Sequence, residues 1–127
     1  MKDSKIIKTV SVPKAIGPYS QGVLYDNLIF TSGQIPLDVE NNIIISKDFS
    51  EQVIQVLNNL KNLIESEGST IEKIIKLNVY LTDLNNFDRL NEIFKDFFKI
   101  NYPARSVVEV SRLPKEAKIE IDAICWK

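Results

Sequence analysis

The apolar positions between residues 49 and 64 repeat at the spacing of a helix with one buried face. They are Phe49, Val53, Val56, Leu57, Leu60, Leu63 and Ile64. Asp48 stands before this stripe as an N-cap, with Glu51 three residues later as its capping-box partner. Gly68 follows as a natural C-terminal stop. The pattern predicts a helix that begins after Asp48 and ends before Gly68.

A second helical stripe lies further along the chain. Its apolar positions are Phe87, Leu90, Phe94, Phe97 and Phe98. Asp83 precedes the stripe and is the predicted cap. The helix has to end before Pro103, because proline cannot continue a helix interior.

Alternating or continuous apolar runs predict strands in most of the remaining chain. Residues 75–82 alternate strictly, which puts Ile75, Leu77, Val79 and Leu81 on one face. The other predicted strands are residues 6–10, 21–25, 28–32, 106–110 and 118–126. The second and third of these form a hairpin that turns at Asp26 and Asn27.

The resulting order, β-β-β-α-β-α-β-β, predicts one α+β domain over residues 1–127, with two helices on one face of a mixed six-stranded sheet. Several strands are apolar on both faces, notably at residues 74–75, 107–108 and 119–126. Two helices cannot cover both faces, and exposed apolar sheet usually marks a subunit interface. The pattern therefore predicts an oligomer. The alternative is a curled sheet that closes on itself.

Composition narrows the class of protein. The 127 residues are 44% hydrophobic and 26% charged, with a net charge of −1. No apolar run approaches the roughly 20 residues of a membrane helix, and no signal-type apolar core follows the N-terminus, so we expect a cytoplasmic protein. The single Cys125 excludes an internal disulfide. No basic stripe suggests nucleic acid as a partner.

The absence of histidine limits the possible chemistry. It rules out Ser-His and Cys-His nucleophile pairs, and together with the single cysteine it argues against a zinc site. Four glycines leave little material for a phosphate-binding loop. Catalysis would have to come from Glu, Asp, Arg, Tyr, Ser, Lys, backbone groups and water.

The most informative stretch is residues 102–107, with the sequence YPARSV. Its proline stops a helical pattern, and Arg105 then stands at the mouth of a strand. Glu120 follows fifteen residues later on another strand. A cation and a carboxylate on neighbouring strands predict a site for a small carboxylate substrate. Taken singly, Arg105 is typical of a surface ion-pair partner and Glu120 of a solvent-facing strand residue.

Several segments resemble the YjgF/RidA family (reactive intermediate deaminase A) in that family's order and spacing, over essentially the whole chain. They are residues 15–21 (AIGPYSQ), 31–36 (TSGQIP), 91–94 (NEIF), 102–106 (YPARS), and 113–115 (LPK) together with 119–121 (IEI).

The resemblance implies a chorismate-mutase-like fold and a homotrimer, in which the apolar sheet faces pack as a central β-barrel and a pocket lies between adjacent subunits. It implies a 2-iminobutanoate/2-iminopropanoate deaminase that hydrolyses reactive enamines and imines, such as 2-aminoacrylate and 2-aminocrotonate, to 2-keto acids and ammonia. Pyridoxal-phosphate dehydratases release such intermediates and would be its functional partners. Neither a metal nor an organic cofactor is implied.

The resemblance also assigns roles to the two charged residues. Arg105 would grip the substrate carboxylate through its guanidinium fork. Glu120 would orient the attacking water or relay a proton, the kind of step to which a placed carboxylate contributes about 10²–10⁴-fold. The group that protonates the enamine carbon is not identified.

Four further residues would bind substrate by the same resemblance. They are Tyr19, Ser32, Gly33 and Asn91. Taken singly, Tyr19 is typical of a half-buried turn tyrosine, Ser32 of a turn serine and Asn91 of a solvated helix residue.

The chain departs from the family pattern at three places. Val107 stands where some members have cysteine, which excludes a cysteine nucleophile there. Asp122 replaces a second glutamate, a difference that we attribute to sheet packing. Lys47 precedes Asp48 where glycine is common, which affects the shape of that loop. Cys125 is expected to be a small buried hydrophobe.

Two other functions remain open at this point. One is a non-catalytic module that uses the same pocket to sense 2-keto acids or amino-acid-like metabolites, although such a receptor has no need of Glu120. An RNA-acting or translation-inhibiting role, attached to some relatives, is disfavoured by the nearly neutral charge and the lack of histidine.

Overall fold

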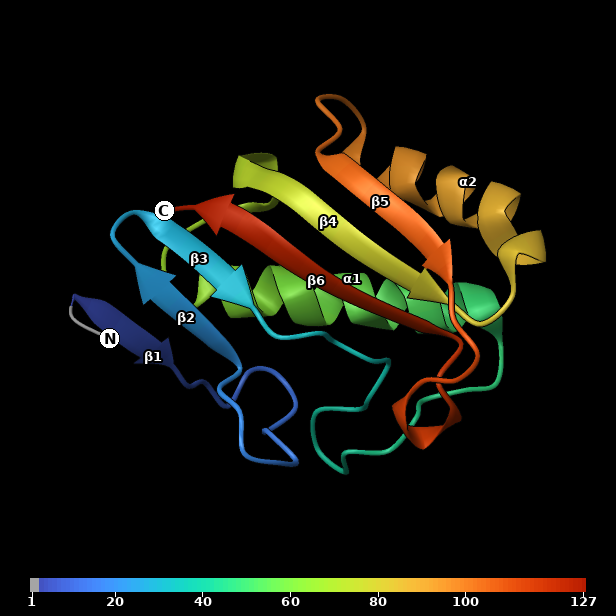
Figure 1. The fold of residues 1–127 in the computed structure, drawn as a ribbon, viewed down its shortest axis with the longest axis horizontal. Coiled ribbons are helices and arrows are strands. Elements are labelled where there is room, and N and C mark those ends of the chain that lie inside the picture. Colours follow the sequence, from blue (N-terminus) through green and yellow to red (C-terminus); the bar gives the residue numbers. More distant parts are fainter. Residues whose placement is uncertain (1–2) are drawn as a thin grey trace.

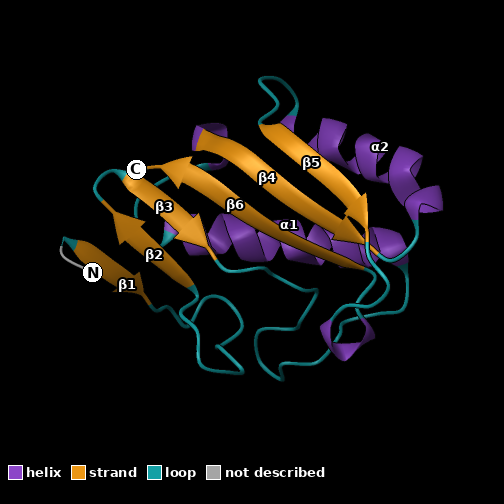
Figure 2. Cartoon of the chain, viewed as in Figure 1, coloured by secondary structure: helices purple, strands orange, loops and turns teal. Residues whose placement is uncertain are grey.

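The computed structural model describes residues 3–127 as a six-stranded mixed sheet with two α-helices on one face (Figures 1 and 2). The strands are β1 (Ser4–Ile7), β2 (Gly22–Tyr25), β3 (Leu28–Thr31), β4 (Ile74–Leu81), β5 (Ala104–Glu109) and β6 (Ile119–Trp126). The helices are α1 (Phe49–Glu65) and α2 (Phe87–Phe98). Three short 3₁₀ turns, η1 (Ile71–Lys73), η2 (Leu84–Asn86) and η3 (Pro114–Glu116), complete the order.

The strands lie in the order β1-β2-β3-β6-β4-β5. Only the β4–β5 pair is parallel among these neighbours, and the other pairs are antiparallel. The predicted element order and the α+β class are confirmed. The alternative of a sheet closed on itself is wrong, because β1 and β5 are open edges of the described sheet.

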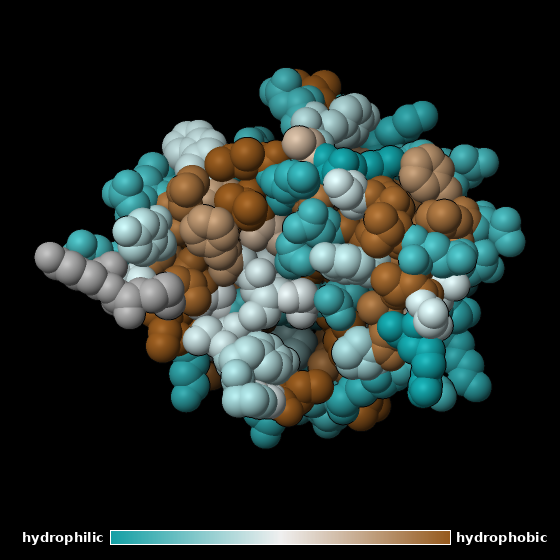
Figure 3. Space-filling model, viewed as in Figure 1, coloured by the Kyte–Doolittle hydropathy of each residue, from teal (hydrophilic) through white to brown (hydrophobic). Residues whose placement is uncertain are grey.

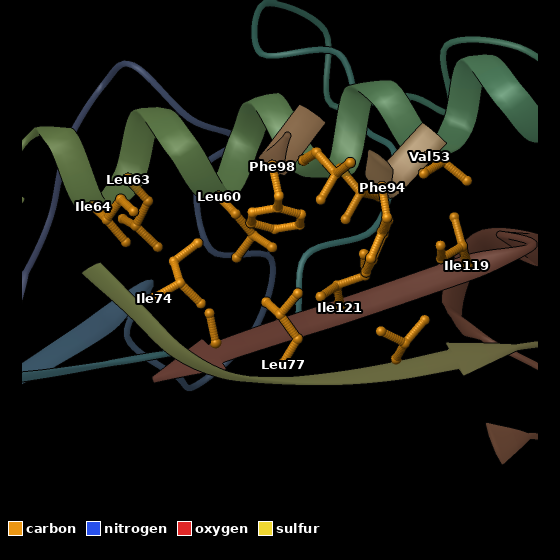
Figure 4. Packing of buried hydrophobic residues seen from close by; sticks show 14 of the residues in the cluster. Val53, Leu60, Leu63, Ile64, Ile74, Leu77, Phe94, Phe98, Ile119 and Ile121 are labelled. Carbon is orange, nitrogen blue, oxygen red and sulfur yellow. The ribbon is translucent and has the colours of Figure 1, made fainter. Parts of the chain in front are cut away.

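The hydrophobic core lies between the helices and one face of the sheet. Leu60 and Leu63 of α1 and Phe94 and Phe98 of α2 point towards Leu77 of β4 (Figure 4). The other large side chains with almost no exposed surface include Ile7, Ile29, Leu57, Ile64, Leu81, Leu90, Ile119 and Ile121. Burial of this apolar surface, at roughly 25 cal/mol per Å², is the main force that holds the helices on the sheet.

The start of α1 shows how the predicted cap forms. The Asp48 carboxylate accepts a hydrogen bond from the backbone N–H of Glu51 at 2.9 Å. The backbone N–H of Asp48 itself donates to the hydroxyl of Ser46 at 2.9 Å, so a serine makes the return contact that the capping box assigns to Glu51. Gly68 follows the helix with φ of 81°, as the predicted stop requires.

The start of α2 differs from the prediction. Asp83 caps η2, where its carboxylate accepts from the backbone N–H of Asn85. The α-helix begins one short turn later, after Asn86, whose side chain makes no capping bond. Phe87, predicted to be part of the buried stripe, is 38% exposed.

Three predicted strands are shifted, and one of them, β5, begins at Ala104 rather than at Ser106. The first strand is residues 4–7 rather than 6–10, because beyond Ile7 the side chain of Gln21 replaces the strand ladder and bonds both the N–H and the C=O of Thr9. β4 contains a bulge at Ile75. Ile74 pairs with Cys125 of β6 and Lys76 pairs with Ile124, so Ile75 has no partner residue on β6. Ile74 is therefore buried and Ile75 is 45% exposed, which reverses the prediction for Ile75.

The second face of the sheet carries no helix, and we call it the open face (Figures 1 and 3). Phe30 projects from it, since its neighbour Ile29 is buried on the helix side. Ile6, Phe30, Val108 and Trp126 are 64%, 40%, 46% and 43% exposed. Figure 3 shows apolar areas separated by polar residues on this face. The second face is thus apolar only in part, because β6, which was predicted to be apolar on both faces, also projects Glu120 and Asp122 from it. No helix among residues 3–127 is long and apolar enough to cross a membrane.

Candidate active site

A cavity of about 340 Å³ opens beside the N-terminal half of β6, where the space-filling view is hollowed (Figure 3). Four of the predicted site residues line it: Tyr19, Ser32, Gly33 and Glu120. The remaining lining residues are Pro13, Lys14, Ile16, Gln21, Gln34, Ile35, Leu37 and Pro114. The cavity is therefore mostly apolar, with a few polar groups that converge on it, as is typical of a small-molecule site.

The segment after β3 is fixed to β6 next to Glu120. The backbone N–H of Gln34 donates to the carbonyl of Ile121 at 2.8 Å, and the N–H of Ile121 donates back at 3.1 Å. Ser32 is tied to the preceding loop, since its hydroxyl donates to the carbonyl of Ser20 at 2.5 Å. The pair of bonds to Ile121 holds Gly33 directly over the Glu120 side chain.

Tyr19 projects from a loop whose shape depends on Gln21. The buried amide of Gln21 donates to the carbonyls of Thr9 and Pro13 at 3.1 and 3.0 Å and accepts from the N–H of Thr9 at 2.7 Å. The Tyr19 hydroxyl accepts from the N–H of Ile16 at 3.2 Å, and its side chain remains 47% exposed. Gln21 is not among the predicted site residues, although it stands directly beside the Tyr-Ser pair of the motif.

Glu120 is the one acidic side chain of the described residues that lines the cavity. Within residues 3–127 its carboxyl makes no hydrogen bond and no ion pair. Burial raises the pKa of this carboxyl, and the neighbouring Asp122 raises the pKa further. An acid with a raised pKa and no bound partner is suited to exchange protons with a ligand.

Arg105 is held by α2 on the other side of the sheet. Its Nη2 donates to Oδ1 of Asn91 at 2.5 Å. The guanidinium lies 5.4 Å from the ring centre of Phe87 and 5.2 Å from that of Phe94, within the range of cation–π attraction. Partial burial lowers the pKa of Arg105 from its ordinary value, although a guanidinium stays charged in proteins. One amide acceptor leaves most of its five N–H groups for a ligand.

Arg105 and Glu120 are not on neighbouring strands, and that prediction is wrong. β4 lies between β5 and β6. Arg105 is also the second residue of β5 rather than a residue at its mouth. Sequence patterns do not reveal this order, because β6 inserts between β3 and β4 through pairings that span most of the chain.

The two residues also face opposite sides of the sheet. Arg105 is in register with Leu77, which is buried under the helices. Glu120 alternates with the buried Ile119 and Ile121 and therefore projects from the open face. One chain accordingly presents two separate groups, which we call the acid half (Tyr19, Ser32, Gly33, Glu120) and the guanidinium half (Asn91, Arg105, Phe87, Phe94).

The two phenylalanines of the guanidinium half were assigned to the core by their helical stripe. Phe87 lies four residues before Asn91 and Phe94 lies three residues after it, so all three side chains share one face of α2. This spacing is the sequence signal that could have placed the two phenylalanines in the site. Among the described residues no three His, Cys, Asp or Glu side chains are arranged to hold a metal ion.

Comparison with known proteins places this geometry in a family. Residues 9–126 match the family described as Endoribonuclease L-PSP. The chain is 45% identical to a RutC family protein of Pyrococcus abyssi, with 97% of both chains covered. It is 41% identical to the human 2-iminobutanoate/2-iminopropanoate deaminase, over 94% of this chain and 88% of that protein.

Solved structures of relatives share the fold of this chain. The crystal structure of Escherichia coli TdcF with bound serine superposes with a TM-score of 0.92 at 44% identity, covering 97% of this chain and 98% of that one. The predicted resemblance is thus confirmed, and the chain belongs to the YjgF/RidA family, also described as Endoribonuclease L-PSP.

Proposed function

We propose that this protein hydrolyses small imines that carry a carboxylate, such as 2-iminobutanoate and 2-iminopropanoate, to 2-keto acids and ammonia. The observation that carries the proposal is the unpaired Glu120 carboxyl, which has a raised pKa and faces a small, mostly apolar cavity. The activity named for the human relative supports the choice of substrate.

The residues supply the functions that this reaction needs. Water adds to the carbon of a protonated imine, C=NH₂⁺, and the adduct loses ammonia to leave a ketone. Glu120 takes a proton from the attacking water and returns one to the departing nitrogen. The apolar wall of the cavity, with Ile16, Ile35 and Leu37, suits a short aliphatic side chain on the substrate.

Arg105 binds the substrate carboxylate through two parallel hydrogen bonds in this proposal. Stacking on Phe87 and Phe94 and the bond to Asn91 fix the plane of the guanidinium before substrate arrives. Such preorganisation saves the entropy of ordering a long side chain in the complex.

The proposed site needs two copies of the chain, because the acid half and the guanidinium half lie on opposite faces of one sheet. A homotrimer that buries the apolar open faces would bring Glu120 of one copy next to Arg105 of the next. This assembly also accounts for Phe30 and Trp126, large side chains that are exposed in the single chain.

A receptor for small carboxylates is the second candidate, because the related TdcF has been crystallised with a bound amino acid. Such a receptor needs Arg105 but has no use for an unpaired acid in the same cavity. Cleavage of RNA has little support here, since the chain has no histidine and a net charge of −1.

The proposal is tested by coupling the protein to a threonine or serine dehydratase and following release of the keto acid. We expect the wild type to accelerate release and Arg105→Ala and Glu120→Gln to lose this effect. Arg112→Ala is the matched control, because Arg112 is exposed and does not line the cavity. If the wild type does not accelerate release, or if Arg105→Ala keeps most of the activity, the proposed function is wrong.

A further inference from the structure

A second carboxyl group lies on the open face of β6 beside the cavity. Asp122 follows Glu120 by two residues, so both side chains project from the same face of the strand. Asp122 is in register with Asn78 of β4, and the Asn78 side-chain N–H donates to Oδ1 of Asp122 at 2.8 Å. Asp122 is therefore held in place by a neighbouring strand.

The two carboxyl groups have different surroundings. Asp122 is stabilised by an amide donor, whereas Glu120 has no such partner within residues 3–127 and faces the cavity. Along an extended strand, residues two apart are separated by roughly 7 Å at Cα, which allows one carboxylate to influence another. When two acids are placed in unlike surroundings, one keeps its charge and the other becomes the proton carrier.

The other titratable groups that face Glu120 do not reverse this difference. Tyr80 is directly opposite Glu120 on β4, and burial and then the two carboxylates raise its pKa. Lys14 and Tyr19 line the same cavity from the N-terminal loop, and neither makes a hydrogen bond or ion pair with Glu120. Burial first, and then Asp122, raise the pKa of Glu120.

We propose that Asp122 is a positioning residue for the reaction: held by Asn78, its carboxylate disfavours charge on Glu120 and so keeps the Glu120 carboxyl able to carry a proton. This inference rests on the proposed function. It replaces our attribution of Asp122 to sheet packing alone.

The test is the titration of Glu120 in the ligand-free protein, followed by NMR of ¹³C-labelled glutamate carboxyls and assigned with Glu120→Gln. Removing the neighbouring negative charge lowers the pKa of Glu120, so we expect its titration to move to lower pH in Asp122→Asn. Asp122→Glu keeps the charge and should stay near the wild type. Asp96→Asn, which removes one charge from the exposed side of α2, should change nothing.

The same variants are then assayed for imine hydrolysis across pH. The part of the pH profile of kcat that reports the titration of Glu120 should move to lower pH in Asp122→Asn, whichever protonation state of Glu120 is active. KM should change little. A loss of activity at all pH values without a shifted limb would indicate a merely structural role and overturn the proposal.

The outcomes separate this inference from the proposed function. A Glu120 titration that is unchanged in a folded Asp122→Asn variant would overturn the inference even if the enzyme is active. A wild type without turnover would overturn the proposed function, while the titration still decides whether Asp122 acts on Glu120. If Asp122→Asn does not fold, Asp122→Ser, which removes the same charge, takes its place, and an unchanged Glu120 titration in that variant would overturn the inference.

Discussion

At the scale of single residues, the glycine at position 33 leaves the space that the Glu120 carboxyl occupies beside the cavity. A Cβ placed on Gly33 would lie 2.8 Å from Cδ of Glu120 and closer still to its Oε2. Gly33 is exposed and its φ is not in the left-handed region, so its backbone conformation does not require glycine. The residue is glycine because the Glu120 carboxyl occupies the space beside it.

We therefore expect Gly33→Ala to fold normally and to lose activity. The flexible Glu120 side chain can move aside at little cost in stability, but displacement of a catalytic group by about 1 Å can cost roughly 10²-fold in rate. Steady-state kinetics and thermal unfolding measure the two effects separately.

Gly68→Ala is the converse control. Gly68 has φ of 81° and no atom within 4 Å of an added Cβ, so alanine there strains the backbone far from the cavity. It should lower stability and leave kcat unchanged. Gly33→Ala with wild-type kcat would show that the position of Glu120 is not critical.

The candidate residues themselves were predictable from the sequence, because short motifs with unusual residue choices surround them. Their surroundings were not. Asn91 as the partner of Arg105, the rings of Phe87 and Phe94 beneath it, and Asp122 beside Glu120 all depend on contacts between elements that are distant in the sequence.

At the scale of elements, α1 positions the start of β6. The buried amide of Gln52 donates to the carbonyl of Ser46 at 2.8 Å and accepts from the backbone N–H of Lys118 at 2.9 Å. Lys118 directly precedes β6, two residues before Glu120. The helix is thus connected to the acid half by one side chain as well as by the hydrophobic core.

We expect Gln52→Leu to destabilise the protein by about 1–3 kcal/mol for each backbone group that loses its partner without regaining water. Chemical denaturation measures this change in the free energy of unfolding. Asn58→Leu, the same kind of substitution on the exposed side of α1, should have little effect. Equal stability of the two variants would show that the Gln52 contacts are dispensable.

Most elements could be predicted, because periodicity and capping are local. The strand order could not, since β6 pairs with β3 and β4 across large sequence separations. Local irregularities were also missed: the bulge that exposes Ile75 and the short turn that moves Asp83 away from the start of α2. The bulge shifts the register of β4 and the turn delays the start of α2, and the hydrophobic pattern of the sequence reveals neither.

At the scale of the whole molecule, the open face and the divided site have one explanation. A single chain leaves large apolar side chains exposed and keeps Arg105 and Glu120 on opposite faces of the sheet. The packing of several copies through their open faces that we propose would bury these side chains and bring the two groups together. Assembly and activity should therefore be lost together.

We expect Phe30→Asp to dissociate the assembly and abolish turnover, because a charge in a buried apolar interface is unpaired. Light scattering coupled to size exclusion, with the activity assay on the same fractions, measures both. Ile54→Asp is the control, since Ile54 is 49% exposed on α1, the helix behind the sheet. A monomeric Phe30→Asp variant with full activity would contradict a site shared between copies.

The most direct test of the account mixes two inactive variants. Arg105→Ala and Glu120→Gln are unfolded together in equal amounts, refolded, and assayed for imine hydrolysis beside each variant refolded alone. If each site takes Arg105 from one copy and Glu120 from its neighbour, random assembly restores both groups in about a quarter of the sites, and activity returns in that proportion. If the mixture stays as inactive as its components while it assembles normally, the site is not shared between copies and the account is wrong.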